Sequence, residues 1–129
     1  MAVDGSLRIM IVDDYTTMLR IMRNLLRQLN FENVEDATDG GVALQKLQQG
    51  NYGLIISDWN MAPVTGIELL RNVRADAKLK TIPFIMVTAE SKTENIVIAK
   101  QAGVSNYIVK PFNAATLKMK MESVLGRLA

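Results

Sequence analysis

Short runs of apolar residues alternate along this chain with longer stretches in which apolar residues recur every three or four positions. The runs cover residues 8–12, 33–37, 53–57, 83–88 and 106–110. The stronger runs are apolar at successive positions, which is typical of strands buried on both faces of a parallel sheet. We therefore predict a strand at each of these runs.

The stretches between and after the strands have the spacing of amphipathic helices. The first covers residues 16–29, and the apolar positions with this spacing are Met18, Ile21, Met22, Leu25 and Leu29. The same pattern predicts helices at residues 42–47, 66–74, 94–102 and 114–128. Glycines end two of them, Gly50 the second and Gly103 the fourth. We predict Asp39, which precedes two glycines, to be a turn residue.

The alternation of strands and helices predicts an α/β fold in three layers, with one parallel sheet between two layers of helices. Right-handed crossovers leave few topologies for such a chain. Its 129 residues match the usual length of one domain. We expect residues 1–129 to form a single domain, with residues 1–6 as an N-terminal tail.

The composition excludes several kinds of chemistry, because the chain has no cysteine and no histidine. Disulfides, thiolate metal sites and imidazole-ligated zinc or iron are excluded. Catalysis by Ser-His-Asp or Cys-His groups is excluded as well. A metal ion in this protein would be held by oxygen atoms, which favours magnesium, calcium or manganese.

The charge and hydropathy of the chain indicate a soluble protein. Fifteen basic and thirteen acidic residues give a net charge of +2, a weak excess that does not favour nucleic-acid binding. No stretch approaches the ~20 apolar residues of a membrane span, and the N-terminus lacks a signal-peptide pattern. We expect a cytoplasmic location.

Chemically reactive residues stand at the ends of four predicted strands. The first strand ends at Asp13 and Asp14, the third at Asp58, the fourth at Thr88 and the fifth at Lys110. Ligands of open parallel sheets bind beyond the carboxyl ends of the strands. If these strands are neighbours in the sheet, their five side chains converge on one small patch.

Three neighbouring carboxylates repel one another and raise each other's pKa unless a cation compensates. Lys110 and a divalent cation are the two candidates for this role. Magnesium is bound through one or two carboxylates and is often completed by phosphate oxygens. A carboxylate also attacks phosphorus to give an acyl phosphate. The group therefore favours phosphoryl chemistry, helped mostly by positioning and charge neutralisation.

Each of these residues also has a simpler structural interpretation. Asp13 and Asp14 would serve as caps for the helix that begins near residue 16. Thr88 would be an ordinary β-branched strand residue, and Tyr107 a half-buried packing residue. Lys110 is the hardest to explain in this way, because a partly buried ammonium requires a partner.

Four segments at the strand ends resemble the receiver domains of two-component response regulators. They are IVDD (11–14), ISDWNM (56–61), VTAE (87–90) and YIVKPF (107–112), and RNLL (23–26), TEN (93–95) and AATL (114–117) extend the likeness over nearly the whole chain. Each segment is a weak signal alone, whereas the ordered set is specific. The likeness is greatest to the single-domain chemotaxis regulators. It implies a flavodoxin-like (βα)5 fold with strand order 2-1-3-4-5.

The resemblance also implies roles for the residues that match the family's motifs. Asp58 would be the phosphorylated aspartate, Thr88 and Lys110 would contact the phosphoryl oxygens, and Thr88 and Tyr107 would change conformation on activation. The bond between Lys110 and Pro111 would be cis. Three further sets follow: Mg²⁺ ligands at Asp13, Asp14, Asp58 and the backbone carbonyl of Asn60; residues that tune dephosphorylation at Asn60 and Glu90; and a partner-binding face at Lys92, Ile96, Tyr107, Val109 and Lys120.

The function implied by the resemblance is that of a phosphorylation-activated switch in a chemotaxis system. A histidine kinase (CheA-like) would donate the phosphoryl group, and a flagellar motor switch protein (FliM-like) would be the target. A phosphatase is a further candidate partner. The protein would be a monomeric signalling protein, not an enzyme, although it would catalyse its own phosphorylation and dephosphorylation. The chain ends with its last helix, so no DNA-binding effector domain is expected.

The segment MAPVTG (61–66) departs from the family pattern. Ala62 stands where the family has proline, Pro63 follows one position later, and Thr65 replaces an acidic residue. The residue before a proline is restricted to extended geometry, so this constraint moves from Met61 to Ala62. We expect a changed loop shape with the catalytic set unchanged.

Three other functions are alternatives, and the residues after the first strand argue against two of them. A phosphate sink would drain the kinase without acting on the motor. An aspartate-nucleophile phosphatase of the haloacid dehalogenase type would need an Asp-x-Asp pattern after the first strand, where residues 13–15 read Asp-Asp-Tyr. A flavodoxin-like FMN carrier would need a Ser/Thr/Gly phosphate cradle there, and Asp13 and Asp14 would repel phosphate.

Overall fold

The protein is a three-layer α/β structure with a parallel sheet in the middle, and the computed structural model describes residues 5–89 and 93–126. The strands pair in the order β2-β1-β3-β4-β5. They are β1 (Ile9–Val12), β2 (Val34–Ala37), β3 (Leu54–Asp58), β4 (Phe84–Thr88) and β5 (Asn106–Val109). The predicted fold and strand order are therefore confirmed.

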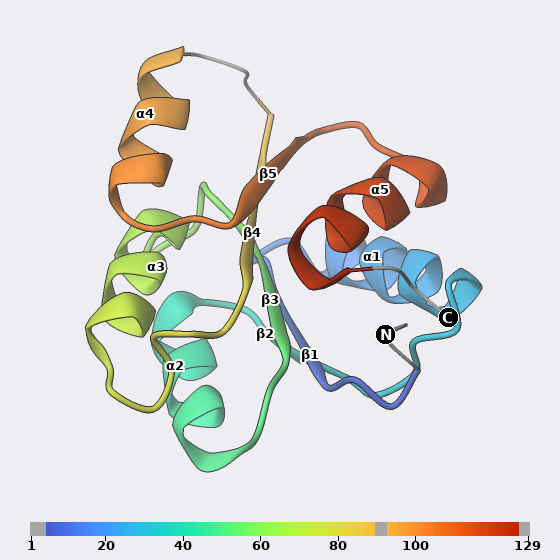
Figure 1. The fold of residues 1–129 in the computed structure, drawn as a ribbon, viewed down its shortest axis with the longest axis horizontal. Helices are drawn as coiled ribbons and strands as arrows, with labels where there is room; N and C mark the ends of the chain where they lie inside the picture. The colour runs from blue at the N-terminus through green and yellow to red at the C-terminus, as the bar shows by residue number, and fades with distance from the viewer. Residues whose placement is uncertain (1–4, 90–92, 127–129) are drawn as a thin grey trace.

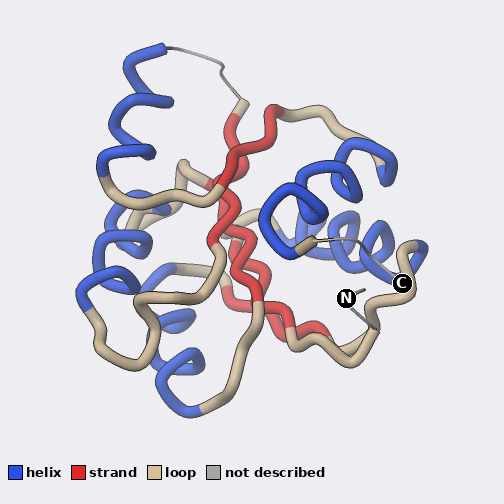
Figure 2. The backbone as a smooth tube through the Cα atoms, in the orientation of Figure 1, coloured by secondary structure: helices blue, strands red, loops and turns tan. Residues whose placement is uncertain are grey.

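Five helices cover the two faces of the sheet. In Figure 1 the sheet is seen on edge, with α1 and α5 on one side and α2, α3 and α4 on the other; the same layers are visible in the tube of Figure 2. The helices are α1 (Thr16–Gln28), α2 (Gly40–Gln49), α3 (Gly66–Ala75), α4 (Thr93–Gln101) and α5 (Ala114–Leu125).

The apolar strands divide their side chains between two cores. Ile9 and Ile11 of β1 pack in the core under α1 and α5, whereas Met10 and Val12 pack in the core on the α2 and α3 side. All four are completely buried. Successive side chains of a strand point to opposite faces, so a strand between two helical layers must be apolar at every position. This is why the central strands read as continuous apolar runs.

Several predicted helix ends differ from the observed ones by up to three residues, and two of these differences have a clear physical cause. Helix α2 begins at Gly40, earlier than the predicted residue 42, because the side chain of Asp39 accepts a hydrogen bond from the Val42 N–H at 3.0 Å. Asp39 is thus an N-cap and not simply a turn residue. Helix α5 ends at Leu125 and not at residue 128, because Gly126 has a positive φ of 95°. Glycine adopts this left-handed conformation without strain and ends helices in this way.

Arg74, at the end of α3, joins three segments of one side of the molecule. Its Nε donates to the carbonyl of Gly103 at 2.8 Å, and its Nη1 donates to the carbonyls of Lys80 at 3.1 Å and Ile82 at 2.6 Å. Its Nη2 is 3.4 Å from the Ser105 hydroxyl. These contacts connect α3 to the segment before β4 and to the turn before β5. They depend on the planar fork of the guanidinium.

Replacing Arg74 with lysine is expected to lower the free energy of unfolding by about 2 kcal/mol, because one ammonium cannot satisfy carbonyls in three places. Urea unfolding followed by circular dichroism measures this value. Arg71→Lys on the exposed side of the same helix is the matched control and should change stability by less than about 0.5 kcal/mol. Equal stability of the two variants would contradict the role given to Arg74.

Within the described ranges, no helix is both long enough and apolar enough to cross a membrane.

Candidate functional site

The carboxyl ends of four strands meet at one edge of the sheet. The register pairs Val12 of β1 with Ser57 of β3, Asp58 of β3 with Val87 of β4, and Thr88 of β4 with Val109 of β5. Asp13 directly follows β1 and Lys110 directly follows β5. The sheet therefore brings the reactive residues of distant segments to neighbouring strand ends.

The three predicted carboxylates form a cluster. One oxygen from each of Asp13, Asp14 and Asp58 lies within 4.8 Å of the others. Asp13 and Asp58 are buried, with 1% and 5% of their surface exposed, whereas Asp14 is exposed. The carboxylates of Asp13 and Asp58 are thus shielded from solvent, whereas that of Asp14 is accessible to it.

Lys110 supplies the compensating positive charge. Its Nζ is 2.9 Å from Oδ1 of Asp58 and 3.6 Å from Oδ2 of Asp13. Burial by itself lowers the pKa of Lys110, but the hydrogen bond to Asp58 and the negative charges of Asp58 and Asp13 raise it more, so the pKa is raised overall. Lys110 is therefore charged at neutral pH and bound mainly to Asp58.

Asp13 is less well satisfied. Burial raises its pKa, and the charges of Asp58 and Asp14 add to this, although the Tyr15 N–H and Lys110 act in the opposite direction. Oδ1 of Asp13 accepts a hydrogen bond from the Tyr15 N–H at 2.9 Å. Oδ2 of Asp13 is buried and accepts no hydrogen bond from any residue in the described ranges. A buried carboxylate oxygen without a donor is costly.

The cluster fits a hard divalent cation. Oδ2 of Asp13 accepts no hydrogen bond from a described residue and has the Lys110 ammonium only at 3.6 Å, and the neighbouring oxygens of Asp14 and Asp58 are close enough to share a cation with it. An all-oxygen donor set is the one that Mg²⁺ prefers. The alternative interpretation, that Asp13 or Asp14 caps α1, is not supported, because the N-cap of α1 is Tyr15 and no side chain caps it.

The loop between β3 and α3 is held close to Asp58 by Gly66. The N–H of Gly66 donates to the carbonyl of Trp59 at 3.0 Å. A Cβ at position 66 would overlap the carbonyl oxygen of Asp58 and would lie 2.9 Å from the Met86 sulfur. Only glycine allows this approach. Asn60, whose carbonyl is a predicted metal ligand, is exposed in this loop.

Replacing Gly66 with alanine is expected to lower the free energy of unfolding by about 2–3 kcal/mol, because the added methyl group overlaps rigid backbone. It should also displace the backbone of Asp58 and slow the phosphorylation that the sequence predicts at this residue. Thermal unfolding and the rate of adduct formation measure the two effects. Gly41→Ala, where the nearest neighbour of the added Cβ is a side-chain oxygen of Asp39 at 3.1 Å, is the milder control. Wild-type behaviour of the Gly66 variant would contradict this interpretation.

A capping box begins the helix after this loop. The Glu68 N–H is 3.3 Å from the Thr65 hydroxyl, and the Glu68 carboxylate accepts from the Thr65 N–H at 3.4 Å. The departure from the family at Thr65 thus preserves an anchored helix start. The spacing of Thr65 and Glu68 before an apolar run is the sequence signal that would have identified this box. The peptide bonds before Pro63 and Pro111 are both cis, the second as predicted.

Of the predicted switch and partner residues, Ile96 lies on α4, Tyr107 and Val109 on β5 and Lys120 on α5, whereas Thr88 ends β4 at the same edge of the sheet as Asp58. Ile96, Tyr107 and Val109 are half-buried. The Lys120 ammonium lies over the ring of Tyr107, 5.0 Å from its centroid. Thr88 is buried at the end of β4, and its carbonyl accepts from the Lys110 N–H at 2.8 Å. Glu90 and Lys92 lie outside the described residues.

Known proteins resemble this chain over nearly its whole length. The family model for the response regulator receiver domain matches residues 9–122. Chemotaxis protein CheY-3 of Vibrio cholerae is 52% identical over 123 residues, which are 95% of each chain. Chemotaxis protein CheY of Pseudomonas aeruginosa is 52% identical over 122 residues, which cover 95% of this chain and 98% of that protein.

Solved structures show the same fold. The structure of Vibrio cholerae CheY4 matches with a TM-score of 0.87 and 35% identity, covering 92% of this chain and 98% of that one. The receiver domain of a sensor histidine kinase from Pseudomonas aeruginosa matches with a TM-score of 0.84 and 25% identity, covering 98% of this chain and 99% of that one. That receiver domain has a magnesium ion coordinated in its active-site cleft.

Proposed function

The chain belongs to the response regulator receiver domain family, and from this we propose that it is a chemotaxis signalling switch that a histidine kinase activates by phosphorylating Asp58. The single observation that carries the proposal is the contact of Lys110 Nζ with Asp58 Oδ1, at 2.9 Å, inside a cluster of three carboxylates. Its relatives at 52% identity are named as chemotaxis proteins. We propose that residues 1–129 act as one cytoplasmic receiver domain.

The reaction we propose is a phosphoryl transfer to a carboxylate. Lys110 engages Oδ1 of Asp58, which leaves Oδ2 to attack the phosphorus of a phosphohistidine. The phosphorus–nitrogen bond breaks as the phosphorus–oxygen bond forms, and the imidazole leaves with the bonding electron pair. Lys110 then pairs with a phosphoryl oxygen, and Thr88 at the end of the neighbouring strand donates to another. In dephosphorylation, water attacks the same phosphorus, the bond from phosphorus to the carboxylate oxygen of Asp58 breaks, and inorganic phosphate leaves the restored carboxylate.

Asp13, Asp14 and Asp58 would hold Mg²⁺, with the carbonyl of Asn60 as a further ligand. When bound, the ion would neutralise the carboxylates and the phosphoryl oxygens. The unsatisfied Oδ2 of Asp13 supports this assignment. Positioning and charge neutralisation are what such a transfer requires of a protein, since the phosphoryl donor supplies the reactive bond.

The output we propose is binding of a flagellar motor switch protein to the face formed by α4, β5 and α5. Phosphorylation would shift the population toward the binding conformation, limited by the partner's differential affinity for the two states. A peptide from a motor switch protein should therefore bind the unphosphorylated protein weakly and the phosphorylated protein more tightly. Fluorescence anisotropy with and without acyl-phosphate donor and Mg²⁺ measures the ratio.

Equal peptide affinity in both states would exclude the motor-switch role while leaving the receiver chemistry intact. The protein would then be a phosphate sink for the kinase. Motility of a deletion strain with an active kinase separates the two roles, because loss of a motor-binding switch removes the effect of the kinase on flagellar rotation, whereas loss of a phosphate sink strengthens that effect.

A further inference from the structure

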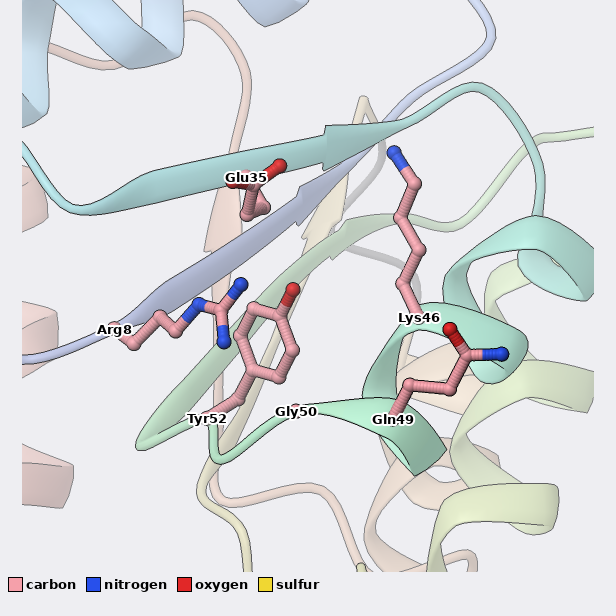
Figure 3. Close-up of a pocket in the computed structure, with 6 residues that line it drawn as sticks. All are labelled: Arg8, Glu35, Lys46, Gln49, Gly50 and Tyr52. Atoms are coloured by element: carbon pink, nitrogen blue, oxygen red, sulfur yellow. The ribbon is translucent and has the colours of Figure 1, made fainter.

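A second polar cavity lies at the opposite rim of the sheet from the carboxylate cluster. Its volume is about 260 Å³, and its walls come from the starts of β1, β2 and β3 and from the last turn of α2. The lining residues are Arg8, Glu35, Lys46, Gln49, Gly50 and Tyr52. In Figure 3, Arg8 and Tyr52 stand together on one side, Lys46 and Gln49 stand on the other, and Glu35 projects from the strand above them.

Two opposite charges in this cavity, those of Arg8 and Glu35, make no ion pair or hydrogen bond within the part of the chain that the structure describes. The guanidinium of Arg8 lies over the ring of Tyr52, 4.5 Å from its centroid. Neither that guanidinium nor the carboxylate of Glu35 makes a hydrogen bond or ion pair with any residue that the structure describes. Lys46, in contrast, donates to the carbonyl of Asp36 at 2.7 Å. Arg8 and Glu35 are therefore the groups available to a ligand.

Gly50 keeps Arg8 and Tyr52 packed together at the wall. A Cβ at position 50 would lie 2.9 Å from Nη1 of Arg8 and 2.8 Å from Cε2 of Tyr52. Gly50 has a φ of −127°, a backbone conformation that any residue adopts. Glycine is therefore needed here because a side chain would not fit, and not because of the backbone conformation. The backbone of Gly50 thus leaves room for the stacked pair, on the side of the pair away from Glu35 (Figure 3).

We propose that this cavity binds a free α-amino acid as a zwitterion, with its carboxylate on Arg8 and its ammonium on Glu35. A simple anion would pair with Arg8 but would leave Glu35 unpaired and would face the negative end of the α2 dipole. A simple cation would be repelled by Arg8 and Lys46. A zwitterion satisfies both unpartnered groups, and a guanidinium binds a carboxylate through two parallel hydrogen bonds.

The charges of the lining also select among amino acids. Arg8 and Lys46 against Glu35 leave one positive charge in excess, which favours a ligand with a negative side chain directed toward Lys46 and Gln49. The cavity is also of a size that suits a molecule smaller than a typical drug. We expect the order of affinity L-glutamate, then glycine, then L-lysine.

The test is a titration of the full-length protein, labelled with ¹⁵N, followed by backbone amide chemical shifts. L-glutamate and glycine should give saturable shifts at Gln49, Gly50 and Tyr52, with Kd values of roughly 1–10 mM. Acetate and methylammonium, which carry one charge each, should bind at least about fivefold more weakly than glycine. Acetate binding as tightly as glycine, or no saturable shift with any of the amino acids at ten times the expected Kd, would overturn the proposal.

Two variants test the two contacts separately. Glu35→Gln should weaken glycine binding by about fivefold and leave acetate binding unchanged or stronger. Arg8→Gln should weaken glycine and acetate by at least about tenfold. Both residues are distant from Asp58, so the phosphoryl adduct should form at the wild-type rate in each variant. This rate serves as the control that each variant is folded. Unchanged glycine affinity in Glu35→Gln would refute the ammonium contact, whatever the outcome at Asp58.

Discussion

Replacing Asp58 with asparagine is expected to abolish phosphorylation completely. The wild-type protein, incubated with Mg²⁺ and a small acyl-phosphate donor, should gain a single phosphoryl group in intact mass spectra. The amide of asparagine keeps the shape of the side chain but cannot form an acyl phosphate, because its nitrogen and oxygen are poor nucleophiles. Chelation of Mg²⁺ by EDTA should remove the wild-type adduct as well.

The matched control for this experiment is Asp39→Asn. Asparagine is as good an N-cap as aspartate, so α2 should be preserved, and Asp39 lies outside the carboxylate cluster. This variant should be phosphorylated like the wild type. An adduct that persists on Asp58→Asn would place the acceptor elsewhere. If Mg²⁺ binds but neither the wild type nor Asp39→Asn gains an adduct, the altered loop at residues 61–66 has disabled the site.

Replacing Asp13 with asparagine is expected to have two opposite effects, a more stable metal-free protein and a loss of Mg²⁺ binding. Neutralising Asp13 removes a buried charge whose Oδ2 lacks a donor and leaves the 2.9 Å pair of Lys110 with Asp58 in place. The gain should be about 1 kcal/mol, which raises the melting temperature by roughly 4 °C in a domain of this size. Mg²⁺ affinity should fall about 100-fold.

Thermal unfolding with and without Mg²⁺ measures both effects. Saturating Mg²⁺, at about 100 times its Kd, should stabilise the wild type by about 2.7 kcal/mol and the variant hardly at all. Asp14→Asn is the control, because Asp14 is exposed and its neutralisation should change metal-free stability little while still weakening Mg²⁺ binding. A lower melting temperature for the metal-free Asp13 variant would contradict the role given to burial.

The pH dependence of this difference follows from the raised pKa of Asp13, which burial causes first and the charges of Asp58 and Asp14 increase. A group whose pKa is raised on folding binds more protons in the folded state, so its contribution to stability is complete below the unfolded-state pKa and is lost as the pH rises through the folded-state pKa. In the metal-free state, the gain in stability of Asp13→Asn over the wild type should therefore be complete at neutral pH. This gain should disappear as the pH falls below the folded-state pKa of Asp13. Melting temperatures measured in EDTA across the acidic range test this.

The strand ends illustrate how much of the site was readable from the sequence. The apolar runs before Asp13 and Asp58 had to be buried strands, because few other structures bury successive side chains on both faces. Lys110 in an apolar context had to have a partner. These local patterns predicted the strands, the layers and the identity of the converging residues. The resemblance added the strand order that makes β1, β3, β4 and β5 neighbours.

Tertiary contacts decided what the local patterns left open. Nothing in the residues around position 66 predicts that a methyl group there would overlap the Asp58 carbonyl, since this approach depends on how α3 returns to the sheet. The apolar pattern of residues 114–128 would allow α5 to continue to residue 128. The helix ends at Leu125 because of the conformation of Gly126. The stacked pair of Arg8 and Tyr52 joins residues that are far apart in the chain.

By itself, the sequence determined the burial of each strand and the chemical types at its end, because hydrophobic periodicity and charge cost are local properties of neighbouring residues. Only the tertiary structure decided which carboxylate oxygen has no donor and which of the two acids Lys110 approaches more closely. These outcomes depend on differences of less than 1 Å between side chains on separate strands. Such distances are set by the packing of the whole sheet against its helices, which no short segment encodes.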